Sequence, residues 1–225
     1  MSAHLQPGSG LQGTQNTDYL ADLIELVEAE EALADKARQK ALSRSYARYV
    51  EEFSEEESPA RHHILLIQAL QGVADGEIKN LIINMPPGSA KSTYTSLLFP
   101  PYWIQKNPGK LLIGASHAGD LAERFGRKVR NLVADAEYAD LFDVELKDDS
   151  RAAGRWETNT ETEYYAVGTG GSITGRRGDI GLIDDPVKGR EEADSDTQME
   201  KLWEWYRSDF LTRLKPGSPQ IIIQT

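Results

Sequence analysis

From residue 61 onward, short apolar runs alternate with segments of helical periodicity, and this alternation limits the possible folds more than any other feature. Four runs, at residues 81–84, 110–115, 181–183 and 220–224, have the length of buried strands. Strands that are apolar along their whole length and are joined through helices are typical of a mainly parallel sheet covered on both faces. The sequence therefore predicts an α/β fold, a three-layer sandwich around a mainly parallel central sheet.

The segments between these runs predict the remaining elements. We expect helices over residues 64–73, 89–99 and 120–133, a long helix that begins after Ser195, and a β-hairpin formed by residues 155–158 and 163–167. Pro100 and Pro101 should end the second of these helices, because proline lacks the N–H that a helix interior uses.

The first 60 residues differ in character from the rest of the chain. Residues 1–16 are small and polar, and we expect a flexible terminus there. Residues 17–60 are rich in Ala, Leu, Glu, Lys and Arg and predict a helical appendage, either two helices or one long bent helix, which the acidic residues 55–57 and Pro59 end. This appendage either packs on the main domain, residues 61–225, or binds a partner.

Composition excludes several classes of function. The chain has 225 residues, enough for one substantial domain, and its lack of cysteine excludes disulfides and cysteine-bound zinc. It has no apolar run of membrane-spanning length and no signal-peptide pattern, so we expect a soluble protein of a reducing compartment. A net charge of -11 argues against a nucleic-acid coat protein. One predicted helix is nevertheless basic, and it faces DNA, a neighbouring subunit or solvent through Arg124, Arg127, Lys128 and Arg130.

Residues 81–93, LIINMPPGSAKST, place a strand, a Pro/Gly/Ser turn and a helix start in succession. Backbone N–H groups of such a turn bind phosphates, Lys91 can reach the β and γ phosphates, and the Ser92 hydroxyl can bind Mg²⁺. Met85 and Ala90 replace the outer glycines of the usual G-x-x-x-x-G-K-[ST] pattern. We predict an ATP site with contacts from Pro87, Gly88, Ser89, Ala90, Lys91, Ser92 and Thr93. The alternative is a strand–turn–helix corner with a chance Lys-Ser pair.

The apolar run at 181–183 leads into Asp184 and Asp185, at the strand end where ligands bind in open α/β sheets. An enzyme that hydrolyses ATP needs a carboxylate for the metal and another to activate water. We assign Mg²⁺ to Asp184 and water activation to Asp185, although Glu is commoner at the second position. Two of the predicted strands, residues 110–115 and 163–167, lie between Lys91 and Asp184, which favours a motor-type ATPase with an additional central strand over a small-molecule kinase. The alternative is a proline turn opened by two Asp residues.

Two further sets of residues flank these motifs. A glycine-rich loop, residues 168–175, leads to Arg176, which we predict to lie near the same sheet edge as Asp184. An arginine there can contact a triphosphate in its own subunit or in a neighbour's, so Arg176 is a candidate catalytic residue. The alternative is a surface arginine. Gln224 and Thr225 follow the last apolar run and either sense the γ-phosphate or simply end a strand.

Four segments in this order, MPPGSAKS, ASHAGDLAERFGRKVR, YAVGTGGSITGRRGDIGLIDDP and QIIIQT, resemble the ATPase domain of tailed-phage large terminase subunits. The resemblance runs from about His62 to Thr225 and is most specific in the third segment. It implies a P-loop NTPase of the RecA/ASCE-like type. It also implies a motor that hydrolyses ATP to drive double-stranded DNA into a procapsid through the portal.

The same resemblance implies roles for individual residues. The family's phosphate-loop pair matches Lys91 and Ser92, its acidic pair matches Asp184 and Asp185, its loop arginine matches Arg176, and its coupling motif matches Gln224 and Thr225. An adenine-contacting segment is expected near residues 61–64, with His63 as its candidate. Many relatives carry an Arg inside the phosphate loop, where this chain has Gly88 and Ser89.

The implied partners are double-stranded DNA, the portal protein and procapsid, and the small terminase subunit, with no membrane. The chain would be a monomer in isolation and would assemble into a homo-oligomeric ring, with a pentamer as one option. It would act in the host cell cytoplasm, docked transiently on the portal. The family's RNase H-like nuclease domain is absent from this chain, so we expect no nuclease activity. Two alternatives are a helicase-like or other DNA-dependent P-loop ATPase and a non-catalytic capsid-assembly adaptor.

Overall fold

The structure, a computed structural model, describes residues 13–54 and 58–225, with side chains from residue 23 onward. The predicted flexible terminus lies largely outside the described residues, and α1 (Gly13–Arg44) begins within its last part. The chain divides after Lys40 into two units. In the first unit α1 is a single helix, and its side chains from Leu23 to Ala37 are all exposed.

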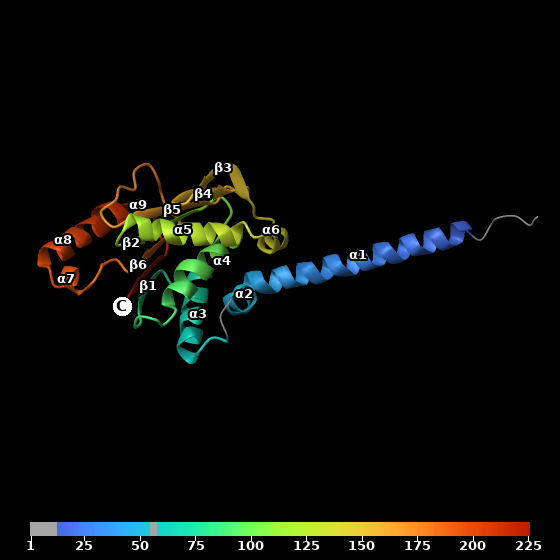
Figure 1. Cartoon of the computed structure of the whole chain (residues 1–225), viewed down its shortest axis with the longest axis horizontal. Helices are drawn as coiled ribbons and strands as arrows, with labels where there is room; N and C mark the ends of the chain where they lie inside the picture. Colours follow the sequence, from blue (N-terminus) through green and yellow to red (C-terminus); the bar gives the residue numbers. More distant parts are fainter. Residues whose placement is uncertain (1–12, 55–57) are drawn as a thin grey trace, which may run out of the picture. The chain divides into compact units, whose positions relative to one another are not determined.

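A seven-stranded sheet forms the centre of the second unit (Figure 1). Its order is β1 (Asn80–Asn84), β7 (Gln220–Gln224), β6 (Ile180–Asp184), β2 (Leu111–Ser116), β5 (Glu163–Gly168), β4 (Arg155–Thr158) and β3 (Leu146–Ala152). The strands from β1 to β5 in this order run parallel, and β4 and β3 add antiparallel pairs at one edge. The predicted mainly parallel sheet is confirmed, and β7 separates β1 from β6.

Helices connect the strands and precede the sheet. Besides α1 and the helix that follows β1, they are α2 (Tyr46–Phe53), α3 (Arg61–Ala74), α5 (Gly119–Val133), α6 (Ala136–Phe142), α7 (Arg190–Ala193), α8 (Asp196–Trp205), η2 (Tyr206–Phe210) and α9 (Leu211–Arg213). α1 ends at Arg44, and α2 begins at Tyr46. Between them, the Ser45 side chain accepts a hydrogen bond from the Arg48 N–H and caps α2. Residues 55–57, expected to end this region, lie outside the described residues. No helix in the described ranges combines the length and hydropathy of a membrane span.

The helix that follows β1 does not end at Pro100 and Pro101, as the sequence predicts. It runs from Lys91 through a π-helical segment, η1 (Thr93–Leu98), into α4 (Phe99–Lys106). Both prolines occupy the first positions of α4. Proline has no N–H to donate, so carbonyl oxygens one turn earlier, in η1, lose a helical hydrogen bond at these positions. The prolines thus fall where the helix changes from π to α geometry, and the helix continues past both.

The predicted apolar strands and the hairpin are all present, with bounds that differ by a residue or so. One observed strand, β3, was not predicted, because its residues, LKDDSRA, are largely polar and only partly buried. It pairs with β4 at the edge of the sheet. An antiparallel edge strand can face solvent and so needs no continuous apolar run.

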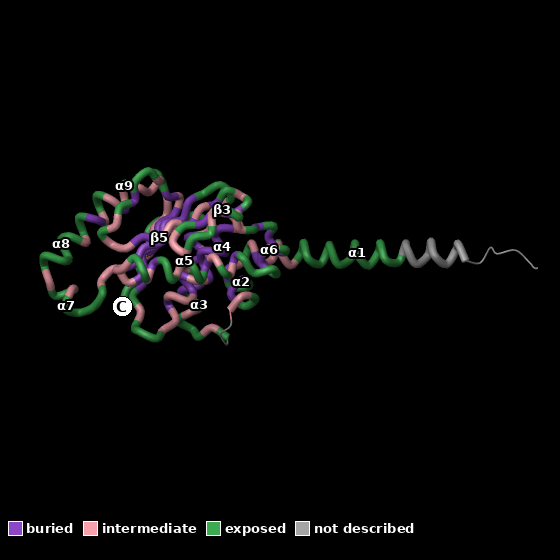
Figure 2. Tube along the Cα trace, turned by 45° about the horizontal axis from the view of Figure 1, so that its top comes forward, coloured by how far each residue is buried: buried purple, intermediate pink, exposed green. Residues whose placement is uncertain are grey.

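Apolar side chains pack on both faces of the sheet, which gives the fold three layers. Leu112 and Ile221 belong to a core that they share with side chains of α2, α3, α4 and α5. The next residues along the same strands, Ile113 and Ile222, pack instead in a second core that includes Phe210 of η2. Buried residues accordingly follow the strands through the second unit (Figure 2). The sheet is thus rigidly held, and its carboxyl-terminal edge can position side chains.

Gly126 allows α5 to approach β5 and the turn between β3 and β4 closely. A Cβ at this position would lie 2.6 Å from the carbonyl oxygen of Ala153 and 3.0 Å from the Tyr164 ring. Gly126→Ala should lower Tm, because overpacking costs about 1–3 kcal/mol and alanine's helix propensity returns only about 1 kcal/mol. Thermal unfolding followed by circular dichroism measures the change. Gly189→Ala, where a Cβ would meet nothing within 4 Å, is the control, and a Gly126→Ala protein as stable as wild type would contradict the packing argument.

Candidate functional site

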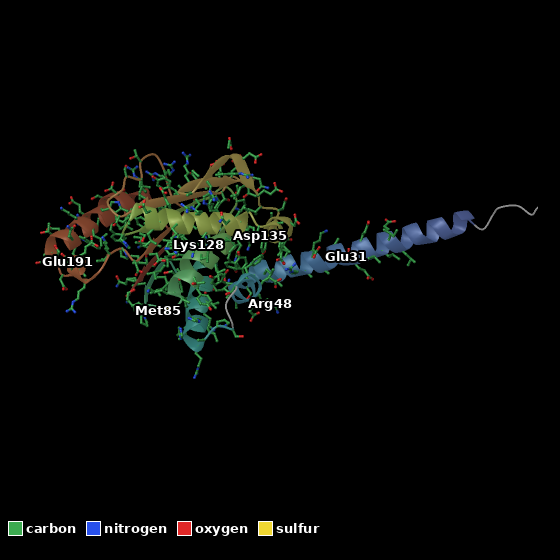
Figure 3. The ribbon with its side chains drawn as sticks, in the orientation of Figure 1. Glu31, Arg48, Met85, Lys128, Asp135 and Glu191 are labelled. Carbon is green, nitrogen blue, oxygen red and sulfur yellow. The ribbon has the colours of Figure 1, made fainter. Side chains whose placement is uncertain are left out.

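The predicted motifs meet at one edge of the sheet. β1 leads into a loop that begins at Met85, labelled in Figure 3, and then into the helix that starts at Lys91. β6 ends at Asp184, and β7 ends one residue before Thr225. Because β1, β7 and β6 are parallel neighbours, their carboxyl ends lie side by side. We call the residues gathered there the edge cluster: Lys91, Ser92, Asp184, Asp185 and Thr225.

The loop between Met85 and Lys91 turns sharply into the helix. Gly88 has φ 73° and Ala90 has φ 54°, both in the left-handed region. Glycine adopts this region without cost, whereas it costs an alanine about 1–2 kcal/mol. The Ala90 carbonyl then accepts the N–H of Tyr94 at 3.2 Å, one of the first bonds of the helix. The backbone is therefore strained directly before Lys91, as is common at ligand sites.

Lys91 is buried, with 6% of its surface exposed. Its Nζ donates a hydrogen bond to Thr225 Oγ1 at 2.9 Å, and Thr225 Oγ1 in turn donates to Asp185 Oδ1 at 3.3 Å. A lysine is seldom buried without a partner. The Thr225 hydroxyl therefore connects the buried cation to one of the two carboxylates.

Asp184 is the most deeply buried carboxylate of the site, with 2% of its surface exposed. Ser92 Oγ donates to its Oδ1 at 3.1 Å, and Ser96 Oγ donates to its Oδ2. Burial raises the pKa of Asp184 and the charge of Asp185 raises it further, whereas the two serine hydrogen bonds and Lys91 oppose the rise. Both carboxylate oxygens are thus fixed by hydroxyl groups from the helix that follows β1.

His63 of α3 contacts the loop from the other side. Its Nε2 lies 2.9 Å from the Ser89 carbonyl oxygen, and its Nδ1 accepts the Ala60 N–H at 3.2 Å. Because Nδ1 accepts, Nε2 is the nitrogen that donates to Ser89. The ring packs 4.6 Å from that of Tyr94, which also lines a cavity of about 490 Å³ with Ile64 and other residues of α2 and α3. The structure therefore places His63 beside the loop, and its contact with adenine stays a prediction.

Arg176 does not lie at this edge, which corrects its predicted position. Its Nε pairs with Glu163 Oε1 at 3.0 Å, and its guanidinium lies 4.2 Å from the centre of the Tyr165 ring. Glu163 is the first residue of β5, at the opposite end of the sheet from Asp184. The glycine-rich loop returns along the sheet before β6 begins, so Arg176 is carried away from the edge cluster. A role toward a neighbouring subunit's nucleotide stays a prediction.

Two other predicted residues also fall outside the cluster. Thr93 belongs to η1 and lines a groove of about 720 Å³ together with Phe53 and Lys128. Gln224 joins the site through its backbone, because its carbonyl oxygen accepts the N–H of Met85 at 3.2 Å. Its side chain is exposed. Of the terminal pair, Thr225 alone therefore hydrogen-bonds to the cluster through its side chain.

Ser96 is the site residue that sequence reasoning missed. It lies in the π-helical segment, four positions after Ser92, and is buried with its hydroxyl on Asp184. Residues four apart lie on neighbouring turns of a helix and share a face. The signal was therefore the Ser-x-x-x-Ser spacing that follows Lys91.

The side chains that could bind Mg²⁺ at this edge are those of Ser92 and Asp184. Among the described residues, no three His, Cys, Asp or Glu side chains gather as a metal site. Ser92 and Asp184 supply one hydroxyl and one carboxylate, and Mg²⁺ is commonly held by one or two carboxylates with phosphate oxygens and water. Ser89 Oγ is buried without a hydrogen-bond partner in the described part of the chain. This unsatisfied hydroxyl and the Lys91 cation both suit a phosphate that arrives with its metal.

Comparison with known proteins supports the fold. The sequence matches no protein-family profile and no curated protein at a significant level. The structure is similar to the crystal structure of the HK97 bacteriophage large terminase, with a TM-score of 0.54 and 10% sequence identity. The similarity covers 81% of this chain and 37% of the terminase chain. At this identity the likeness establishes a terminase-like fold, and the chain spans little more than a third of that protein.

Asp184 should make stability depend on pH. Its raised pKa means that the folded chain binds the proton more tightly than the unfolded chain, so stability falls as pH rises above the ordinary value of 3.8. Asp184→Asn removes the charge and keeps the shape. It should raise Tm by a few degrees at pH 7 and lose this advantage as pH approaches 3.8.

Thermal unfolding over a series of pH values tests this expectation. Asp140→Asn, at an exposed position of α6, is the matched control and should show no such gain. A lower Tm for Asp184→Asn at pH 7 would mean that the charge of Asp184 stabilises the folded chain, contrary to the burial argument.

Proposed function

We propose that this chain is an ATP hydrolase, the motor domain of a large-terminase-type protein that moves double-stranded DNA into a procapsid. The observation that carries the proposal is the edge cluster, in which hydrogen bonds join Lys91 to Asp185 through Thr225 and join Ser92 to Asp184, the residue just before Asp185. Hydrolysis of ATP needs this set: a cation for the phosphates, a hydroxyl and a carboxylate for Mg²⁺, and a second carboxylate for water. The terminase-like fold supports the same reading.

The phosphate chain of ATP would bind at the loop before Lys91. N–H groups of the loop and of the helix start would face the β and γ phosphates. Lys91 Nζ would exchange its bond with Thr225 for a phosphate oxygen. Ser92 and Asp184 would hold Mg²⁺, which draws charge from the phosphates and orients them. Ser96, through its bond to Asp184, would keep that carboxylate in place.

Asp185 would orient and deprotonate the attacking water. Its Oδ1 already bonds to Thr225, which also bonds to Lys91. A change in the position of Lys91 on binding ATP would therefore reach Asp185 through a single hydroxyl. Thr225 fits a residue that reports the state of the γ-phosphate, and His63, whose ring packs on Tyr94 and contacts the loop at Ser89, fits the adenine end.

The wider role is also a proposal. The partners would be double-stranded DNA, the portal protein and procapsid, the small terminase subunit and further copies of the chain in a ring, in the host cell cytoplasm. A helicase-like or other DNA-dependent ATPase is the first alternative, and a non-catalytic adaptor is the second. Turnover that DNA stimulates, without packaging by an assembled procapsid, would favour the first. ATP binding without turnover even in the assembled state would favour the second.

Lys91→Ala should abolish turnover. Removal of one preorganised charge from a phosphoryl site commonly costs about 10²-fold or more in rate, and the loop backbone that shapes the site does not depend on this side chain. Phosphate release with ATP and Mg²⁺, with and without DNA, is the measurement. Lys79→Ala removes an exposed lysine just before β1 and serves as the matched control. Equal turnover in both variants would reject the assignment of the loop.

Asp185→Asn should keep nucleotide binding and lose hydrolysis. Asn tolerates the left-handed backbone better than most residues, and Asp185 has φ 45°. The substitution therefore removes the carboxylate with little change to the backbone. Binding of a fluorescent ATP analogue and single-turnover phosphate release separate the two effects. Normal hydrolysis by Asp185→Asn would show that another group activates the water.

A further inference from the structure

His117, the first residue after β2, binds the backbone of Asp185 twice. Its N–H donates to the Asp185 carbonyl oxygen at 3.2 Å, and its ring Nδ1 lies 3.1 Å from the same oxygen. A carbonyl oxygen only accepts, so Nδ1 is the ring nitrogen that carries a proton. The side chain therefore repeats a hydrogen bond that the backbone already makes.

Asp185 is a residue whose conformation needs such support. β6 ends at Asp184, opposite Ser116 of β2, and the chain then turns through a φ of 45° at Asp185. This region costs a non-glycine residue about 1–2 kcal/mol. The Asp185 N–H donates to the Ile223 carbonyl oxygen at 2.9 Å, so bonds from β7 and from His117 hold the turn on both sides. Strained residues persist only where neighbours fix them in this way.

His117 is itself fixed by the loop after β5. Thr169 Oγ1 donates to the His117 carbonyl oxygen at 3.2 Å, and the Thr169 N–H donates to the Ser116 carbonyl oxygen at 2.8 Å. The imidazole is half-buried and lines a cavity of about 230 Å³ with Thr169, Gln198 and Lys201. Since it lines a cavity and belongs to neither core, shortening it should cost little packing energy.

We propose that His117 is a positioning residue for the water-activating carboxylate. By donating to the Asp185 carbonyl oxygen, its ring holds the backbone turn from which the Asp185 side chain reaches Thr225. The residue acts through Asp185 and touches no reacting atom. This inference rests on the proposed ATP hydrolysis and adds a residue to which the resemblance assigns no role.

The test compares His117→Ala with His117→Asn in the full chain. The Asn side-chain N–H stands at the same number of bonds from Cα as Nδ1, so it can keep the donation, whereas Ala cannot. His117→Ala should lower kcat about tenfold, the typical effect of one lost hydrogen bond, with little change in KM for ATP. His117→Asn should restore most of kcat. A wild-type kcat in the Ala variant, an Asn variant as slow as Ala, or a loss confined to KM would each overturn the proposal.

A second readout needs no turnover. Amide hydrogen exchange at Asp185, followed by NMR, should be faster in His117→Ala and near wild type in His117→Asn, because the turn loosens only when the ring donor is lost. Unchanged exchange in the Ala variant would overturn the proposal even for a chain that hydrolyses no ATP. Failure of the proposed function looks different: the wild-type chain would release no phosphate, or Lys91→Ala would release as much as wild type.

Discussion

The carboxylate of Asp184, buried between the hydroxyls of Ser92 and Ser96, is the contact on which the site depends. It ties the end of β6 to the helix that follows β1, although β7 lies between the two strands. Burial raises its pKa, so the charge is held at a cost to the folded state. A carboxylate in this position lowers the stability of the fold but is available to a ligand. Such groups are common in sites that bind a metal or a phosphate.

Much of the site could be predicted because it depends on topology. Apolar runs between helices imply parallel strands, and parallel strands bring their carboxyl ends to one edge, so Lys91, Asp184 and Thr225 were expected to meet. The position of Arg176 could not be predicted, because glycine content indicates a turn and leaves its direction open. Ser96 was missed because the Ser-x-x-x-Ser spacing after Lys91 was not used to predict that Ser92 and Ser96 share a helix face. The strand β3 was missed because its residues are polar, and it forms by pairing with β4 at the edge of the sheet.

Two independent lines lead to the proposed function. The likeness to the HK97 large terminase concerns the backbone alone, at 10% identity. The chemistry comes from the side chains, which form two adjacent sets of hydrogen bonds: Lys91 to Asp185 through Thr225, and two serine hydroxyls to Asp184. Ala90, just before Lys91, and Asp185, just after Asp184, both have strained backbone angles in the left-handed region. The loop and the strand end are therefore held in costly conformations that a ligand could use.

The most direct test of the account is a crystal structure of the chain with Mg²⁺ and a non-hydrolysable ATP analogue. In the structure described, Lys91 Nζ bonds to Thr225 Oγ1 at 2.9 Å. The account predicts that the phosphates lie against the loop between Met85 and Lys91, that Lys91 Nζ has moved from Thr225 to a phosphate oxygen, and that Mg²⁺ lies beside Ser92 and Asp184. An analogue bound elsewhere, or bound with the contact between Lys91 and Thr225 intact, would contradict it.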